Sequence, residues 1–244
     1  MRIAVAGGTG VVGRHVVEVA HERGYDVAVL TRSQGVDLTT GAGLEERLAG
    51  VDAVVDATNI ATQKRAAAEE FFSRVSRHLL AAGAGAEVGH HVVLSIVGID
   101  DVDTGYYAGK RRQERAVAEG DVPWSVLRAT QFHEFAEQAL GFARVGPFSL
   151  VPRMLSQPVA AREVGEALVD LATGRPVGRA PELAGPERHQ MVDLARRVAR
   201  LHGRRVVPVR LPGRAGAAMR SGALLPTTDG PRGRVTFDAW LEAR

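Results

Sequence analysis

The sequence predicts an α/β fold, a doubly wound parallel sheet with a small C-terminal lobe. Three observations predict it. Apolar runs alternate with helix-like segments over residues 1–128. These runs are continuously apolar, as strands are in a parallel sheet covered on both faces. A glycine cluster separates the first apolar run from the first helical segment, as in doubly wound folds. We expect a core at 1–128 and a smaller lobe at 129–244, packed as one compact protein.

The elements of the core follow in order along the chain. Apolar, β-branched runs predict strands at 3–6, 26–31, 53–56, 91–95 and 124–127. Helical periodicity predicts helices at 14–23, 43–48, 62–82 and 106–119. The pattern is looser in the smaller lobe, where we predict helices at 131–144, 162–172, 190–201 and 237–243 and strands at 180–184 and 205–209. Residues 145–158 are predicted as loop with short apolar pieces, and residues 213–230, broken by glycine and proline, as a helix followed by a mobile loop.

The glycine cluster after the first strand has the spacing of a dinucleotide-binding turn. Gly8-x-Gly10-x-x-Gly13 fits one form of the motif, and Gly7-x-x-Gly10-x-x-Gly13 fits another. Such glycines allow a tight turn, close approach of a pyrophosphate, and close packing of the helix on the strand. The pyrophosphate then lies at the positive end of the helix. We therefore expect cofactor contacts from Gly7, Gly8, Thr9, Gly10, Val11, Val12, Gly13 and Arg14.

The end of the second strand indicates which nicotinamide cofactor binds. An NAD site usually carries a carboxylate there, whereas this strand ends in Thr31 and Arg32. A guanidinium at this point pairs with a 2′-phosphate, so NADP(H) is favoured over NAD(H), with Arg32 as anchor and Ser33 beside it. In the loop that follows, Asp37 and Leu38 fit an adenine contact, or Asp37 is a turn residue. A solvent-exposed role for Arg32 is the alternative.

Tyr106 and Lys110 form the pair that carries chemistry. Four residues apart on a predicted helix, they share one face. A nearby ammonium lowers the pKa of a phenol, which then exchanges a proton with a carbonyl oxygen during hydride transfer. Lys110 also suits the nicotinamide ribose. The adjacent Tyr107 competes for the acid role or contacts substrate, and an ordinary exposed helix face is the alternative for the pair.

Three other residues are candidates for substrate contact. Ser95 ends the fourth predicted strand, where a hydroxyl reaches a substrate oxygen or simply caps a turn. Phe132 and His133 follow the last core strand and are expected to face substrate. A histidine packed at the start of a helix is the favoured alternative for His133.

Composition and motifs narrow the function classes further. The formal charge is +3, and the arginines are scattered without interleaved aromatic residues, so no nucleic-acid partner is expected. The chain has no cysteine and no apolar run long enough to span a membrane, which fits a cytoplasmic protein without a membrane partner. The histidines lack metal-site spacing, so we expect no metal. Neither a Gly-x-Ser-x-Gly nucleophile turn nor a Gly-Lys-Ser/Thr phosphate loop occurs.

Taken together, these motifs resemble the short-chain dehydrogenase/reductase superfamily. Residues 127–132 and 185–195 are similar to its atypical, NmrA-like branch of NAD(P)-binding proteins. The resemblance implies a Rossmann fold, a nicotinamide cofactor and a catalytic triad of Ser95, Tyr106 and Lys110. It also implies that Thr58 and Asn59 border the nicotinamide half of the cofactor.

The leading functional hypothesis is an NADP(H)-dependent oxidoreductase. It transfers hydride between the nicotinamide and a carbonyl or quinone-like small molecule. One alternative is a non-catalytic NADP(H) sensor, because some members of the NmrA-like branch act in that way. A second alternative is an epimerase or dehydratase that keeps its cofactor bound.

Overall fold

The computed structural model describes all residues 1–244, which fall into two compact units. Unit 1 comprises Met1–Ser95, Thr104–Arg128 and Arg162–Ala180. Unit 2 comprises Ile96–Asp103, Ala129–Ala161 and Pro181–Arg244. These units differ from the expected division at residue 128 in two places, because residues 96–103 belong to unit 2 and residues 162–180 belong to unit 1. Residues 162–180 bring a helix and an edge strand back to the sheet of unit 1, which a division by sequence position cannot show.

The sheet of unit 1 confirms the predicted doubly wound α/β fold. Its order is β2-β1-β3-β4-β5-β9, and the pairs β1–β2, β1–β3, β3–β4 and β5–β9 are parallel. The strands are β1 (Arg2–Ala6), β2 (Asp26–Leu30), β3 (Ala53–Asp56), β4 (His90–Ile96), β5 (Trp124–Ala129) and β9 (Gly178–Arg179). The side chains of β3 and of Ile3–Ala6 in β1 are almost fully buried, as their continuous apolar runs predict.

The chain reverses its direction of progress across the sheet at β1. It passes from β1 to β2 on one side and then returns to place β3 on the other side. Ala6 is in register with both Leu30 and Asp56, so the loops that follow these three strands emerge at one edge. In open α/β sheets, ligands bind outside the carboxyl ends of the strands at such a reversal. This edge is where the glycine loop lies.

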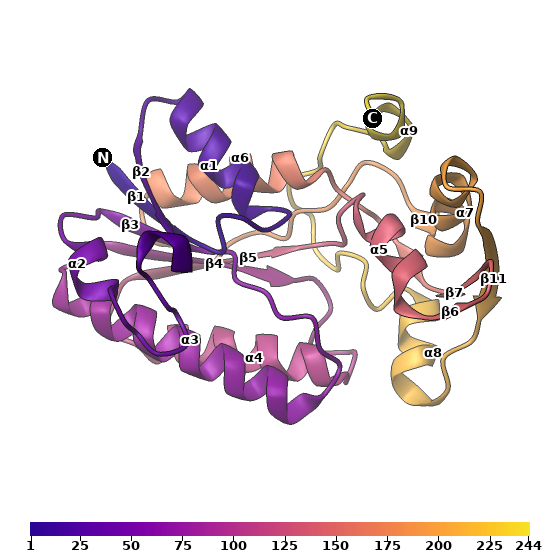
Figure 1. Ribbon diagram of the computed structural model, residues 1–244, viewed down its shortest axis with the longest axis horizontal. Coiled ribbons are helices and arrows are strands. Elements are labelled where there is room, and N and C mark those ends of the chain that lie inside the picture. The colour runs from indigo at the N-terminus through magenta and orange to yellow at the C-terminus, as the bar shows by residue number, and fades with distance from the viewer. The chain divides into compact units, whose positions relative to one another are not determined.

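Helices cover both faces of the sheet (Figure 1). On one side lie α1 (Gly13–Glu22) and α6 (Ala161–Thr173). The two helices approach closely at Gly165, where a Cβ would lie only 3.0 Å from His15. The Arg162 guanidinium donates to both carboxylate oxygens of Glu22, and this contact lowers the pKa of Glu22. On the other side lie α2 (Leu44–Leu48), α3 (Arg65–Gly85) and α4 (Gly105–Ala118). A 3-10 turn, Arg32–Gln34, follows β2.

Unit 2 is built around a small three-stranded sheet of order β11-β7-β6. Its strands are β6 (Arg144–Val145), β7 (Phe148–Pro152) and β11 (Arg205–Val209), beside a two-stranded pair of β8 (Leu155–Ser156) and β10 (His189–Gln190). Its helices are α5 (Phe135–Phe142), α7 (Met191–Leu201), α8 (Gly213–Ser221) and α9 (Phe237–Glu242).

The predictions for unit 2 were partly wrong. Residues 145–158, predicted as loop, contain β7, and the predicted strand at 180–184 is only a pair of isolated bridges. Strand β7 pairs in parallel with β11, which lies more than 50 residues later in the chain. Local sequence patterns do not encode such a partner, so the short run between Pro147 and Pro152 does not stand out as a strand.

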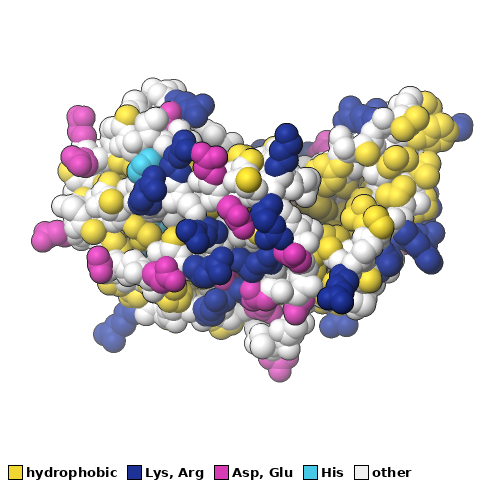
Figure 2. All heavy atoms as spheres, turned by 90° about the horizontal axis from the view of Figure 1, so that it is seen from below, with side chains coloured by type: hydrophobic (Ala, Val, Ile, Leu, Met, Phe, Trp, Pro, Cys, Tyr) yellow, Lys and Arg dark blue, Asp and Glu magenta, His cyan; other side chains and the backbone are white.

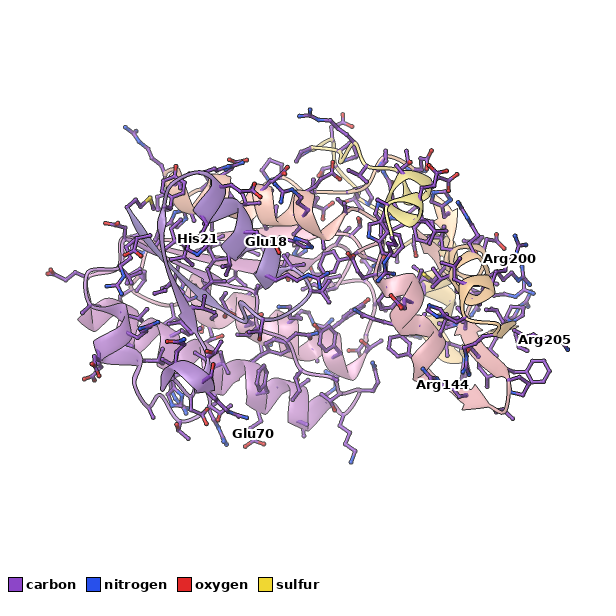
Figure 3. The ribbon with its side chains drawn as sticks, turned by 45° about the horizontal axis from the view of Figure 1, so that its top comes forward. Glu18, His21, Glu70, Arg144, Arg200 and Arg205 are labelled. Carbon is purple, nitrogen blue, oxygen red and sulfur yellow. The ribbon has the colours of Figure 1, made fainter.

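Charges of both signs are interspersed on the face of unit 1 that carries α3 and α4 (Figure 2). This mixture is typical of solvated helix faces. Glu18 and His21 on α1 and Glu70 on α3 are exposed in the same way (Figure 3). None of the helices combines the length and the apolar character that a membrane crossing requires.

Candidate cofactor and active site in unit 1

The backbone of the glycine loop leaves no room for a side chain at Gly7 or Gly13. Gly7 has a φ of +76°, and a Cβ there would lie 2.6 Å from the carbonyl oxygen of Ala57. The Gly10 N–H donates to the Gly7 carbonyl over 2.9 Å, which closes the turn. A Cβ on Gly13 would lie 2.0 Å from that same carbonyl. The loop is therefore packed tightly against the chain after β3, and α1 begins directly on the turn.

The start of α1 is arranged to receive an anion. Val12, at the N-cap, has no side chain that caps the first turn, and no acidic residue lies in that turn. Thr9, Gly10 and Arg14 are exposed beside it. Backbone N–H groups and the helix dipole attract negative charge at such a position. The loop and the helix start together fit the pyrophosphate of a dinucleotide.

Arg32 lies just beyond β2, with its side chain 78% exposed. Its Nε is 3.5 Å from Oδ2 of Asp37. The other oxygen of Asp37 accepts hydrogen bonds from the backbone N–H and the hydroxyl of Thr39, and these bonds lower the pKa of Asp37. Thus Asp37 is a turn residue that also pairs with Arg32. Ser33 is exposed beside them and its hydroxyl lies 3.0 Å from that of Thr31, while Leu38 packs partly into the core.

The segment after β3 connects the glycine loop to the tyrosine. Asp56 accepts the backbone N–H and the hydroxyl of Thr58, which makes a tight turn, and a Cβ on Gly7 would lie 2.9 Å from Thr58 N. The next residue, Asn59, accepts the phenolic hydrogen of Tyr106 at 2.7 Å. The structure therefore brings three predicted positions together, in the order Gly7, Thr58–Asn59, Tyr106.

Tyr106 is half-buried against aromatic neighbours. Its ring meets Phe72 edge-on with centroids 5.9 Å apart, and Tyr107 lies at the same separation on another side. Burial, and then the neighbouring Tyr107, raise the pKa of Tyr106 above its ordinary value. Burial also raises the pKa of Tyr107 to about 12. Both phenols are therefore protonated at neutral pH, and the expected lowering of the Tyr106 pKa is not found.

Lys110 is buried, and its ammonium group has other partners. Nζ donates to the Leu94 carbonyl and to Oε1 of Gln113, both at 2.7 Å, and lies 4.7 Å from the centre of the Phe72 ring. Burial lowers the pKa of Lys110 to about 8, although Asp56 and Glu114 act in the opposite direction. The desolvation cost exceeds the attraction of the two carboxylates. In this arrangement Lys110 joins α4 to β4.

Ser95 is directed into a buried ionic network. Its hydroxyl donates to Glu114 at 2.5 Å, and the Ser95 side chain is 1% exposed. Arg128 donates to both oxygens of Glu114, at 2.9 and 2.7 Å, and Arg179 adds a third guanidinium contact at 3.1 Å. The structure therefore places Ser95 with Glu114 and Arg128, whereas Tyr106 lies with Asn59.

Sequence reasoning missed the residues that build this network. Asp56, Gln113, Glu114, Arg128 and Arg179 were not among the predicted site residues, yet Asp56, Gln113 and Glu114 are buried. Gln113 links Lys110 to Asp56, because its amide donates to Asp56 Oδ2 at 2.8 Å. Two features of the sequence indicate this network. Polar residues stand at the carboxyl ends of three predicted strands, and Glu114 follows Lys110 by one helical turn.

Of the predicted substrate residues in unit 2, His133 is a packed interior residue. It is 1% exposed, and its ring contacts Phe237 and Trp240 at centroid distances of 5.5 and 5.6 Å. Its Nε2–H donates to the Val235 carbonyl at 3.0 Å. The expectation that His133 faces substrate is corrected, because α9 covers the ring. Phe132 is half-buried and forms a bridge with Val159.

The sequence is similar to one known protein family and to one curated relative. The pattern of the NAD dependent epimerase/dehydratase family matches residues 3–94, which include the glycine loop and Asn59. A reductase of Streptomyces griseus is 31% identical over 223 residues, which cover 81% of this chain and 74% of the relative. That relative is named (4-alkanoyl-5-oxo-2,5-dihydrofuran-3-yl)methyl phosphate reductase.

Solved structures share the fold. UDP-glucose 4-epimerase of Thermus thermophilus, in complex with NAD, superposes with a TM-score of 0.68 at 21% identity over all of both chains. An NADPH-dependent quinone oxidoreductase of Escherichia coli superposes with a TM-score of 0.69 at 15% identity, over 99% of this chain and 98% of that one. At these identities the likeness shows a common fold.

Proposed function

We propose a reductase activity from one established premise: the chain belongs to the NAD-dependent epimerase/dehydratase family of the short-chain dehydrogenase/reductase superfamily. The proposed reaction is NADP(H)-dependent reduction of a carbonyl or quinone-like small molecule. A single observation carries it. The Tyr106 hydroxyl bonds to Asn59, which follows directly on the Thr58 turn packed against the glycine loop. A proton donor on α4 thus contacts the segment that packs against the cofactor loop.

The residues of unit 1 fit the cofactor. The tight turn, in which a Cβ on Gly7 or Gly13 would collide with backbone atoms, leads directly into the uncapped start of α1, and the backbone N–H groups there suit a pyrophosphate. We assign Gly7–Gly13, Arg14 and Arg32 to its phosphates, and Thr58 and Asn59 to the side of the nicotinamide. A bound nicotinamide supplies or accepts the hydride.

Tyr106 is proposed to donate the proton in the direction of reduction. Its raised pKa keeps the phenol protonated at neutral pH, which suits donation to a carbonyl oxygen. Asn59 holds the hydroxyl in place by accepting its hydrogen before substrate arrives. Lys110 is a positioning residue, because its ammonium fixes the start of α4 to the end of β4.

The preference for NADP(H) is proposed from Arg32. The guanidinium follows β2, is mostly exposed, and has only a 3.5 Å contact with Asp37 to hold it. A 2′-phosphate would be a stronger partner than this carboxylate, whose Oδ2 lies 3.5 Å away, because guanidinium–phosphate pairs are short and bidentate.

The substrate class is proposed from the relative. The substrate named for the Streptomyces griseus reductase carries alkanoyl and oxo groups on a small ring. A conjugated oxo compound of similar size, or a quinone, is therefore the class that we expect this chain to reduce.

The test is NADPH oxidation by the purified protein with a panel of α,β-unsaturated carbonyl compounds, ketones and quinones. Tyr106→Phe keeps the ring packing and removes the hydroxyl group that would donate the proton. Tyr107→Phe, which makes the same change at the next residue, is the matched control. We expect kcat/KM to fall about 100-fold or more for Tyr106→Phe and to change by less than about threefold for Tyr107→Phe. Equal activity of the Tyr106→Phe variant and the original protein would remove Tyr106 from the mechanism.

The sensor alternative rests on the Lys110 contacts. Nζ of Lys110 is bonded to Leu94 and Gln113, and the pKa of Tyr106 is raised, so the lysine does not activate the tyrosine in this arrangement. Saturable NADPH binding without consumption across the whole panel would favour this alternative. A cofactor that copurifies and is not released would favour the epimerase or dehydratase alternative. Membership of the NmrA-like branch stays a prediction.

A further inference from the structure

Unit 2 contains a pocket of about 410 Å³ whose wall is rich in arginine. It lies between the strand ends of the small sheet, the start of α7 and the helix α8. Its lining includes four arginines, one carboxylate and one amide: Arg153, Arg196, Arg210, Arg220, Asp193 and Gln190. Its volume is typical of sites for small molecules.

The pairing of two strands builds one wall of the pocket. Pro152, at the end of β7, is in register with Val209, at the end of β11. The next residues are Arg153 and Arg210, and the Arg153 N–H donates to the Val209 carbonyl at 2.9 Å. Parallel pairing therefore fixes two arginines next to each other at the same edge. Arg196 comes from α7, and Arg220 comes from α8.

The charge of this wall is poorly neutralised within the chain. Asp193 accepts from Arg196 at 3.0 Å, and Arg220 uses one nitrogen to donate to the Leu211 carbonyl. Arg153 and Arg210 have no carboxylate partner. The surrounding stretch 188–220 contains nine arginines and one acidic residue. Figure 2 shows dark blue side chains outnumbering magenta ones at the right-hand end, which carries α7, α8 and β11 in Figure 1.

We propose that this pocket binds a small organic phosphate or diphosphate. Like charges repel one another, so four guanidiniums around one cavity favour a dianionic occupant. Guanidinium groups hold phosphate oxygens with two parallel hydrogen bonds, and the Gln190 amide adds a neutral donor. No aromatic side chain lines the pocket, so base stacking is not available, and recognition rests on the phosphate group.

The test uses pyrophosphate as the probe and isothermal titration calorimetry at constant ionic strength. The pocket variant is Arg153→Gln/Arg210→Gln, because both residues are exposed and lack ion pairs, so the fold is expected to survive. The matched control is Arg200→Gln/Arg205→Gln, which removes the same charge from two exposed residues of unit 2 that do not line the pocket (Figure 3). Circular dichroism and thermal unfolding without ligand check that both variants fold.

We expect one saturable pyrophosphate site on the original protein. Its Kd should rise at least about tenfold in the pocket variant and less than about twofold in the control. Absence of saturable binding, or an equal loss in both variants, would overturn the proposal, because general attraction to a basic surface is the same for both pairs. The measurement needs neither cofactor nor turnover and is therefore independent of the proposed reductase activity.

Discussion

Glu114 accepts the hydroxyl hydrogen of Ser95 at 2.5 Å, and the same carboxylate is held by both nitrogens of the Arg128 fork. This relationship changes the role of Ser95. The resemblance to the superfamily implied a catalytic serine, whereas the structure shows a side chain 1% exposed and committed to a buried carboxylate.

Replacing Ser95 by Ala should therefore affect stability more than activity. We expect a loss of about 1 kcal/mol in the free energy of unfolding and a change in kcat/KM below about threefold. Glu114→Gln should cost more, roughly 3 kcal/mol, because it leaves buried guanidinium charge unbalanced. Urea unfolding and NADPH oxidation measure the two effects. A 100-fold loss of activity in a Ser95→Ala protein that folds normally would restore the catalytic role.

Lys110 should make stability depend on pH in the alkaline range. Its pKa is about 8 in the folded protein and near 10.5 when unfolded, so the unfolded chain binds more protons between these values. Stability should therefore rise with pH, by roughly 2 kcal/mol between pH 8 and 10, and this gain is absent below pH 8. Above pH 10 the raised pKa of Tyr107 has the opposite effect, because the unfolded chain loses that proton first.

Lys110→Met should flatten the rise, since a neutral side chain of similar length replaces the buried ammonium. The chain offers a matched control in Lys64→Met, which changes the other lysine, an exposed one. Urea unfolding at half-unit steps from pH 7 to 10 measures the effect. A rise that persists unchanged in Lys110→Met would show that another group causes it.

Arg32 should distinguish the two nicotinamide cofactors. We expect Arg32→Ala to raise the Kd for NADPH about tenfold while changing that for NADH less than about twofold, because only NADPH carries the 2′-phosphate.

Asp37→Asn keeps the oxygen that Thr39 donates to, and it removes the charge that pairs with Arg32. This variant should bind NADPH more tightly. Fluorescence titration measures both, and parallel changes for NADH and NADPH would contradict the assignment.

Gly109 is expected to be required by helix packing. A Cβ there would lie 2.8 Å from atoms of Ala68 and Phe72 on α3, so Gly109→Ala should destabilise the protein by about 1–3 kcal/mol. Gly85, the last residue of α3, has open space around its Cα. Gly85→Ala should stabilise by about 0.5–1 kcal/mol, because alanine has the higher helix propensity. Thermal unfolding compares the two, and stabilisation by both changes would show that helix propensity outweighs packing at Gly109.

Local patterns predicted most of unit 1 and, in unit 2, the elements α7, β11 and α9, but they did not predict β7. The buried strands of unit 1 are continuous apolar runs, so β1, β3 and β4 lie within about one residue of prediction at either end. In unit 2, β7 exists because β11 pairs with it, and His133 is buried because α9 covers it. Both depend on segments that lie far along the chain.

The sequence by itself determined the fold class, the glycine loop and the position of Arg32, since each depends on residues that are neighbours in the chain. Only the tertiary structure decided which polar groups meet. Tyr106 could have faced Lys110 or Asn59, and Ser95 could have faced the cofactor or Glu114. Helix spacing fixes which residues share a face, but the packing of α4 against α3 and the ends of β3 and β4 fixes their partners.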